Sequence, residues 1–249
     1  MYSSAIYPNE EASLAEAQVH KMSTICQRLE LTADDHLLEI GTGWGGLAIY
    51  AAQHYGCKVT TTTISDAQYE YAKNRIEQLG LDDKITLLKK DYRDLTGEYD
   101  KLVSIEMIEA VGFEYLPSFF KQCNERLKPG GKLLIQSITI ADQRFEHYKH
   151  NVDFIQRYIF PGGFLPSVTV LTQNLTQYTD LVTESINDMG LDYARTLADW
   201  REAFLQSWPE LKPFGYDEKF KRLWLYYFAY CEGAFLERST STVHLVARK

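Results

Sequence analysis

The chain has 249 residues, of which 45% are hydrophobic and 24% are charged, as expected for a globular protein with one large core. Its formal net charge of −8 argues against a nucleic-acid partner and gives no attraction to an anionic membrane surface. The four cysteines are too far apart in sequence for a metal knuckle or a redox pair, and no signal peptide is apparent. We expect one cytoplasmic domain over residues 1–249, without a bound metal.

Apolar and β-branched runs alternate with amphipathic segments along the chain. Asn9 is expected to cap the first helix, which would run to about Leu31. Strands are expected at 36–40, 58–64, 85–88, 99–105, 132–140, 181–186 and 243–247. Further helices are expected at 46–56, 67–79, 117–127, 195–206 and 217–237. This alternation predicts a doubly wound, mostly parallel α/β sheet of seven strands with an antiparallel C-terminal hairpin.

Residues 141–180 break this rhythm, because they form a long connection between the fifth strand and the sixth. Connections of this length are usually binding loops or lids. We therefore expect 141–180 to be a lid insertion that contacts the substrate.

The turn after the first strand reads Gly41-x-Gly43-x-x-Gly46, which suits either a dinucleotide or S-adenosylmethionine (SAM). A dinucleotide fold would place an acid at the tip of the second strand, but residues 60–65 are four threonines followed by Ile and Ser. Glu39 suits the amino-acid end of SAM and would repel a pyrophosphate. Asp91-Tyr92-Arg93, after the third strand, suits adenine. Together these features favour SAM.

Three further motifs are Tyr2-Ser3-Ser4-Ala5, residues 105–112 (IEMIEAVG) and residues 158–167 (YIFPGGFLPS). With the glycine turn, they give the chain a resemblance to the cyclopropane-fatty-acyl-phospholipid synthases and their mycolic acid relatives. These are class I SAM-dependent methyltransferases with a Rossmann-like fold. The resemblance covers nearly the whole chain, although the bacterial lipid enzymes usually carry an additional N-terminal region.

The resemblance implies that an alkene in a phospholipid acyl chain attacks the methyl group of SAM. Loss of a proton from the resulting carbocation then closes a cyclopropane, which requires a dry site and a base. The implied base is a bicarbonate ion. The implied partner is an unsaturated phospholipid, reached by transient contact with the inner membrane surface, and oligomerisation stays open.

The resemblance also assigns the anion site. It carries the glutamate to Glu109, the tyrosine to Tyr193 and the backbone group to Ile138. Ser4 stands where the family has cysteine, and Gln136 stands where it has histidine. Both can donate a hydrogen bond, but glutamine cannot take up a proton near neutral pH. A bicarbonate bound here would lack a histidine that could pass its proton onward, and a methyl-branched or methylene-bearing product becomes an alternative to the cyclopropane.

Other site residues follow from the same resemblance. Glu106 could be confused with Glu109, since it lies three residues earlier in the same motif. Cys231 matches a position proposed as catalytic in the family, although a small buried helix residue is the simpler interpretation. Phe160, Phe164 and Leu165 are candidates for an acyl tunnel. The cofactor residues implied are Tyr2, Ser3, Glu39, Gly41, Thr42, Gly43, Trp44, Gly45, Thr63, Ile64, Gln68, Asp91, Tyr92, Arg93 and Ile105.

Two other functions stay open at this point. One is a SAM-dependent N-methyltransferase of small amines, in which a site carboxylate would face the amine. The other is a non-catalytic protein that binds SAM or lipid.

Overall fold

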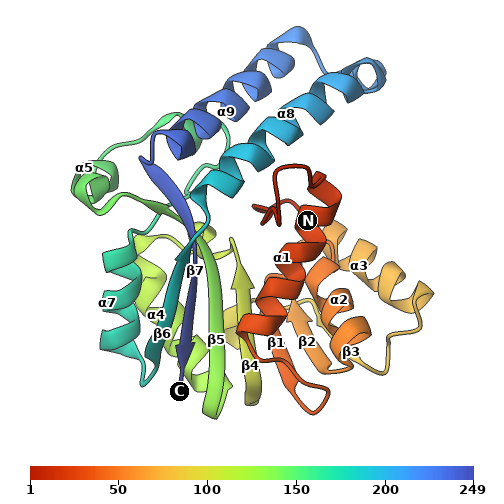
Figure 1. Ribbon diagram of the computed structural model, residues 1–249, viewed down its shortest axis with the longest axis vertical. Coiled ribbons are helices and arrows are strands. Elements are labelled where there is room, and N and C mark those ends of the chain that lie inside the picture. The colour runs from red at the N-terminus through yellow and green to blue at the C-terminus, as the bar shows by residue number, and fades with distance from the viewer.

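The computed structural model describes residues 1–249, and seven strands form one sheet in the order β3-β2-β1-β4-β5-β7-β6 (Figure 1). Strands β1 to β5 are parallel, and β7 is antiparallel to both of its neighbours, β5 and β6. The predicted fold class is thereby confirmed. The strands are β1 (His36–Ile40), β2 (Lys58–Thr62), β3 (Ile85–Leu88), β4 (Tyr99–Ile105), β5 (Leu127–Ile140), β6 (Val182–Asp188) and β7 (Thr240–Arg248).

The helices are α1 (Leu14–Arg28), α2 (Gly46–Tyr55), α3 (Asp66–Gln78), α4 (Leu116–Arg126), α5 (Phe145–Lys149), α6 (Phe154–Tyr158), α7 (Val168–Tyr178), α8 (Gly190–Leu211) and α9 (Glu218–Leu236). The first helix was predicted to start at Asn9, which is wrong. Ser13 caps it instead, since its Oγ accepts from the Glu16 amide and Glu16 Oε2 accepts from the Ser13 amide. This capping box fixes the start of α1. None of the helices is long and apolar enough to cross a bilayer.

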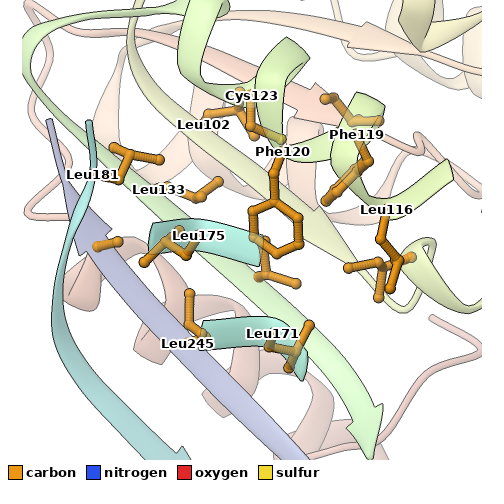
Figure 2. Close-up of a cluster of buried hydrophobic side chains, with 14 of the residues drawn as sticks. Leu102, Leu116, Phe119, Phe120, Cys123, Leu133, Leu171, Leu175, Leu181 and Leu245 are labelled. Atoms are coloured by element: carbon orange, nitrogen blue, oxygen red, sulfur yellow. The ribbon is translucent and has the colours of Figure 1, made fainter. Parts of the chain in front are cut away.

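Two apolar layers sandwich the sheet, because successive side chains of each strand point to opposite faces. On one face, Leu133 and Leu245 pack with Phe120 of α4 and Leu171 of α7 (Figure 2). On the other face, alternate strand residues such as Leu134 pack in a second cluster with α1 and α2. Burial on both faces explains the continuous apolar runs of the central strands.

The segment 141–180 has two parts. Its last helix, α7, buries Val170, Leu171 and Leu175 in the core under the sheet. The part before it carries α5 and α6 and reaches the end of the molecule where α8 and α9 extend beyond the sheet (Figure 1). Only this earlier part therefore lies outside the core, and its role as a lid stays a prediction.

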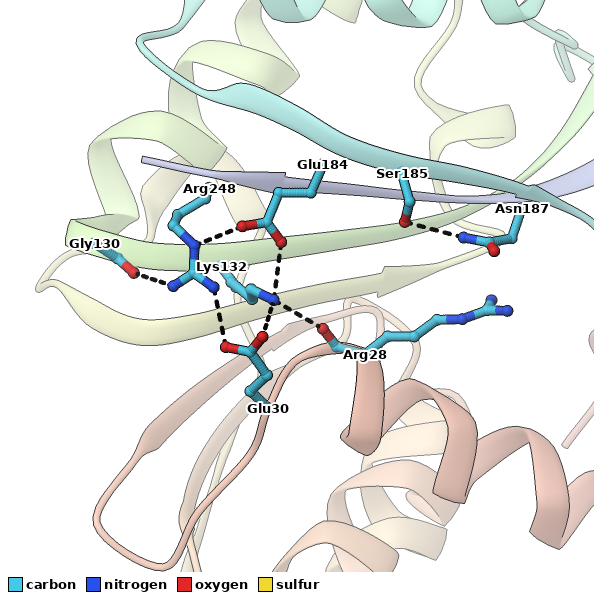
Figure 3. A network of polar contacts seen from close by, with 8 residues as sticks. All are labelled: Arg28, Glu30, Gly130, Lys132, Glu184, Ser185, Asn187 and Arg248. Carbon is cyan, nitrogen blue, oxygen red and sulfur yellow. Dashed lines mark hydrogen bonds and ion pairs between the residues drawn. The ribbon is translucent and has the colours of Figure 1, made fainter.

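An ion-pair network ties the end of α1 to the strands beside it (Figure 3). Lys132 on β5 bonds Glu30 at 2.7 Å and Glu184 at 2.8 Å. Arg248 on β7 bonds the same two carboxylates, at 3.0 and 2.6 Å. The side chain of Lys132 is nearly buried, so its two partners also satisfy a charge that has lost most of its water.

Candidate active site

A large cavity lies at the carboxyl edge of the sheet, and its volume is about 1320 Å³. Its wall is built from the turn after β1, the first three residues, the loop after β4, residues 140–165 and the helices α8 and α9. Of the 40 residues that line it, 21 are hydrophobic. The volume exceeds the range of roughly 300–1,000 Å³ for common ligand sites, so the cavity has room for more than one ligand.

The glycine turn forms one end of this cavity. Gly41, Gly43 and Gly45 have φ angles of 101°, 52° and 81°, a region that glycine adopts without strain. A Cβ at Gly43 would lie 3.4 Å from the Tyr2 ring, and one at Gly41 would lie 3.4 Å from Met107. Gly41, Thr42, Gly43, Trp44 and Ile105, all predicted cofactor residues, line the cavity. The turn thus presents bare backbone at the start of α2, a geometry that suits an anionic group of a ligand.

The N-terminal residues close over this end. Tyr2 and Ser3, which are also predicted cofactor residues, line the cavity. The Gln68 amide donates to the Tyr2 hydroxyl at 3.0 Å, and the Lys21 ammonium donates to the Ser3 hydroxyl at 2.8 Å. The Gln18 amide donates to the Ser3 carbonyl at 2.9 Å. Helices α1 and α3 therefore hold this segment in place.

The other predicted cofactor residues lie outside the cavity wall. Glu39 is buried beneath the turn, where it accepts a hydrogen bond of 2.6 Å from Thr61, and burial raises its pKa to about 8. Asp91 accepts two bonds from the Arg93 guanidinium, so these side chains pair with each other. Gly45, Thr63, Ile64, Gln68 and Tyr92 also lie outside the wall. The cofactor roles of these residues, like those of the predicted residues that line the cavity, stay predictions.

A half-buried carboxylate, Glu106, accepts hydrogen bonds from three groups that were predicted to surround a bound anion. Its Oε1 accepts from the Ser4 amide at 2.9 Å and from Gln136 Nε2 at 2.7 Å. Its Oε2 accepts from the Tyr193 hydroxyl at 2.9 Å. Glu106 follows β4 with a φ of 48°, a left-handed conformation that is rare for residues with side chains and recurs at functional sites.

Burial raises the pKa of Glu106, while the charge of Lys21 and the three hydrogen bonds oppose this rise. Burial also raises the pKa of the Tyr193 hydroxyl well above its usual value, which keeps it a donor. Lys21 itself is fully buried, and burial lowers its pKa to about 7. Lys21 is a site residue that the sequence analysis missed.

The second carboxylate, Glu109, lines the same cavity but has fewer hydrogen-bond donors around it. Its Oε1 accepts from the Ile138 amide at 2.5 Å, and its Oε2 has no hydrogen-bond partner. Burial and then the charge of Glu106 raise the pKa of Glu109 to about 8. Because donors favour the ionised form, we assign the negative charge to Glu106 and the proton to Glu109 at neutral pH.

The prediction that Glu109, Tyr193, Ser4, Gln136 and Ile138 surround one bound anion is therefore corrected. Tyr193, Gln136 and the Ser4 amide donate to Glu106, whereas Ile138 donates to Glu109. The Ser4 hydroxyl donates to the carbonyl of Ala5. The residues present do not fit bicarbonate. The groups predicted to donate to it already donate to the carboxyl groups of Glu106 and Glu109, and the negative charge of a carboxylate would repel a further anion.

The far wall of the cavity is aromatic. Tyr148, Phe160, Phe164, Tyr227 and Phe235 line it with Leu165, which includes all three predicted tunnel residues. Cys231 also lines the cavity, and burial raises the pKa of its thiol to about 12. The nucleophilic thiolate is therefore scarce at neutral pH. No group of three or more His, Cys, Asp or Glu side chains is placed to hold a metal ion.

The family model described as mycolic acid cyclopropane synthetase matches residues 1–245. The chain is 40% identical over 239 residues to the cyclopropane-fatty-acyl-phospholipid synthase of Escherichia coli (strain K12), which covers 96% of this chain and 59% of that protein. It is 39% identical over 222 residues to a tuberculostearic acid methyltransferase of Mycobacterium tuberculosis, covering 89% of this chain and 52% of that protein. It thus spans between half and three fifths of these relatives.

Solved structures share the fold. A cyclopropane synthase from Mycobacterium tuberculosis superposes with a TM-score of 0.92 at 24% identity, covering 100% of this chain and 90% of that one. A mycolic acid cyclopropane synthase in complex with SAH and CTAB also gives a TM-score of 0.92, at 23% identity and the same coverage. Coclaurine N-methyltransferase gives 0.82 at 21% identity, covering 100% of this chain and 77% of that one.

Proposed function

Because the chain belongs to the mycolic acid cyclopropane synthetase family, we propose that it transfers a methyl group from SAM to the double bond of an unsaturated phospholipid acyl chain. The observation that carries this proposal is the Glu106 carboxyl group, which accepts hydrogen bonds from three donors in the wall of a large, half-apolar cavity. The proposal also draws on the relatives, whose names describe lipid methylation and cyclopropane formation.

The glycine turn and the N-terminal residues would hold SAM. The bare backbone at Gly41 and Gly43 fits a closely approaching ligand, and the Tyr2 ring lies beside Gly43. When bound there, SAM supplies an electrophilic methyl group. The turn itself contains no Asp or Glu. No acidic side chain of the turn therefore competes for the backbone amides at the start of α2, which would face the carboxylate of SAM.

The aromatic wall would hold the acyl chain. Tyr148, Phe164, Tyr227 and Phe235 present rings that exclude water and stabilise a cation through their faces. Two other residues of the wall, Val152 and Phe160, are 73% and 55% exposed on the insertion. Apolar side chains that are shared by the cavity and the surface suit a transient contact with a membrane, from which the chain would enter.

Glu106 would accept the proton that the reaction releases. The alkene π electrons would form the new C–C bond to the methyl group while the bond between that methyl group and the SAM sulfur breaks, and the sulfur would keep that electron pair. A carbocation would be left on the neighbouring alkene carbon. A proton then passes to the Glu106 carboxylate, and the C–H electron pair closes a cyclopropane or forms a new double bond. Gln136 cannot accept this proton, and Tyr193 remains protonated, so Glu106 is the base of the cluster.

The test is incubation with isotopically labelled methyl-SAM and vesicles of an unsaturated phospholipid, followed by mass spectrometry of the acyl chains. We expect labelled acyl chains from the wild type and from Glu114→Gln, which removes an exposed carboxylate outside the cavity. We expect almost no label with Glu106→Gln. Methylation of a small amine without any lipid methylation would overturn the proposal, as would the absence of transfer to any acceptor.

A further inference from the structure

We propose that His244 and Arg28 are positioning residues that orient the Gln136 amide, so that Gln136 can only donate to Glu106. This inference deepens the proposed function and rests on it. A polar chain of hydrogen-bonded side chains runs behind the cavity, from α1 through β7 and β5 to the Glu106 carboxylate.

Gln136 and His244 are a cross-strand pair. They stand directly opposite each other in the antiparallel ladder of β5 and β7, and both are completely buried. His244 Nε2 and Gln136 Oε1 are 2.9 Å apart. Their neighbours on the same face, Leu134 and Val246, pack in the core cluster that includes α1, so the pair lies beneath that helix. Two polar side chains in such a layer need partners, since unpaired ones would cost folding energy.

Arg28 fixes the direction of every hydrogen bond in this polar chain. Its Nη1 lies 2.5 Å from His244 Nδ1. A guanidinium only donates, so Nδ1 must accept and the proton of a neutral imidazole must sit on Nε2. Nε2–H then donates to Gln136 Oε1, which leaves the Gln136 NH₂ group to face Glu106. The reversed amide would place its oxygen against a carboxylate.

The charges around the imidazole agree with this geometry. Burial, followed by the charges of Arg28 and Lys21, lowers the pKa of His244 well below its usual value. A doubly protonated ring would also turn a second donor toward Arg28. His244 is therefore a neutral, fixed tautomer and not a carrier of protons. The polar chain holds Glu106, the proton acceptor, in place. It moves no proton itself, because the Gln136 amide interrupts any proton relay.

The ion-pair network of Figure 3 holds Arg28 at the required place. The Arg28 carbonyl accepts from Lys132 Nζ at 3.4 Å, and Lys132 is bound in turn to Glu30 and Glu184. The Arg28 side chain extends away from this network (Figure 3). The end of α1 is thus clamped to β5, β6 and β7, while its guanidinium reaches His244.

The tautomer is measurable without any assay of function. In protein labelled with ¹⁵N-histidine, two-bond ¹H–¹⁵N correlation spectra distinguish the two neutral tautomers from the protonated ring. We expect His244 to keep the Nε2–H form from pH 8 to pH 5.5, with the resonance assigned by its loss in His244→Leu. An Nδ1–H form, or titration near pH 6.5, would overturn the proposal.

The catalytic effect is tested with a graded pair of variants. His244→Leu removes the donor to Gln136, and we expect kcat to fall roughly ten- to hundredfold, as for a lost bond that supports a charged group, with little change in KM. Because Glu106 would then hold its charge less well, the acid limb of the pH–rate profile should move to higher pH. His244→Gln, whose amide can donate from a similar position, should recover most of the rate.

His54→Gln is the matched control, since His54 is an exposed histidine outside the cavity wall. If His244→Leu is folded and keeps the wild-type rate and pH profile, the positioning role is overturned even where the tautomer is as expected. If the wild type methylates no lipid at all, the proposed function fails instead, while the spectra still test the orientation of the chain.

Discussion

Glu106 and Glu109 lie three residues apart and line the same cavity, but their surroundings are opposite. Glu106 accepts three hydrogen bonds and lies near the Lys21 charge. Glu109 accepts from one amide and has an oxygen without a partner. Burial alone therefore does not decide which carboxylate serves as a base, because both residues are half-buried and the number of donors separates them. The motif that contains both residues does not reveal this difference.

The largest effect is expected from Glu106→Gln, which keeps the shape of the side chain and removes the charge. General bases contribute roughly 10²–10⁴-fold to rate, so we expect the methyl-transfer rate to fall within that range. Binding of SAM, measured by calorimetry, should change less than threefold, since Glu106 is not part of the glycine turn. A fall of less than fivefold in a folded Glu106→Gln protein would contradict the contrast between the two carboxylates.

Tyr193→Phe should have the next largest effect. It removes the one donor to Glu106 Oε2 and leaves the stacking of the ring on Phe235, at 4.5 Å, in place. Loss of a hydrogen bond to a charged group corresponds to roughly a ten- to hundredfold lower rate. Steady-state kinetics with a fixed lipid vesicle would measure it. An unchanged rate would show that Oε2 needs no donor.

Glu109→Gln should change the pH dependence of stability more than the rate. The pKa of Glu109 is raised to about 8 in the folded protein, so the folded state binds more protons than the unfolded state between pH 4.5 and pH 8. Stability therefore falls as pH rises through this window, and the cost is complete above pH 8. Between pH 6 and pH 9 the wild-type melting temperature should fall by about 5 °C more than that of the variant. Parallel curves would contradict the raised pKa.

Cys231→Ser should have the smallest effect. The thiol is half-buried and its raised pKa keeps it protonated, and neither alkene methylation nor proton removal needs it. We expect the rate to stay within about twofold of the wild type, as for a conservative change away from a charged network. A hundredfold loss in a folded variant would instead support the catalytic role that the resemblance suggested.

Much of the fold was predictable. The ranges given for β1, β3 and β4 agree with the structure, because apolar runs bounded by turns mark buried strands clearly. The start of α1 was missed because Asn9 and Ser13 are both plausible caps, and only the reciprocal bond from Glu16 distinguishes them. Helix α7 was included in a lid because sequence does not show that its apolar face meets α4 under the sheet.

The sequence predicted which residues lie in the candidate site, but not which donor bonds to which acceptor. Tyr193, Gln136 and Ser4 do lie together, yet their acceptor is Glu106, because the left-handed backbone at that residue turns its side chain into the cluster. His244 carried a signal that was overlooked, namely one polar residue inside the apolar run Val243–Val246 of a buried strand. Its partner depends on the register of β5 and β7, which short-range pattern does not fix.

The most direct measurement is the dependence of the methyl-transfer rate on bicarbonate in buffer freed of carbon dioxide. If Glu106 is the built-in base, the wild-type rate should not change when bicarbonate is added. Glu106→Gly should be nearly inactive alone and should recover activity with bicarbonate or formate. Glycine tolerates the left-handed backbone at this position and leaves the three donors free for a small anion. A wild-type rate that collapses without bicarbonate and returns when it is added would contradict the assignment of Glu106.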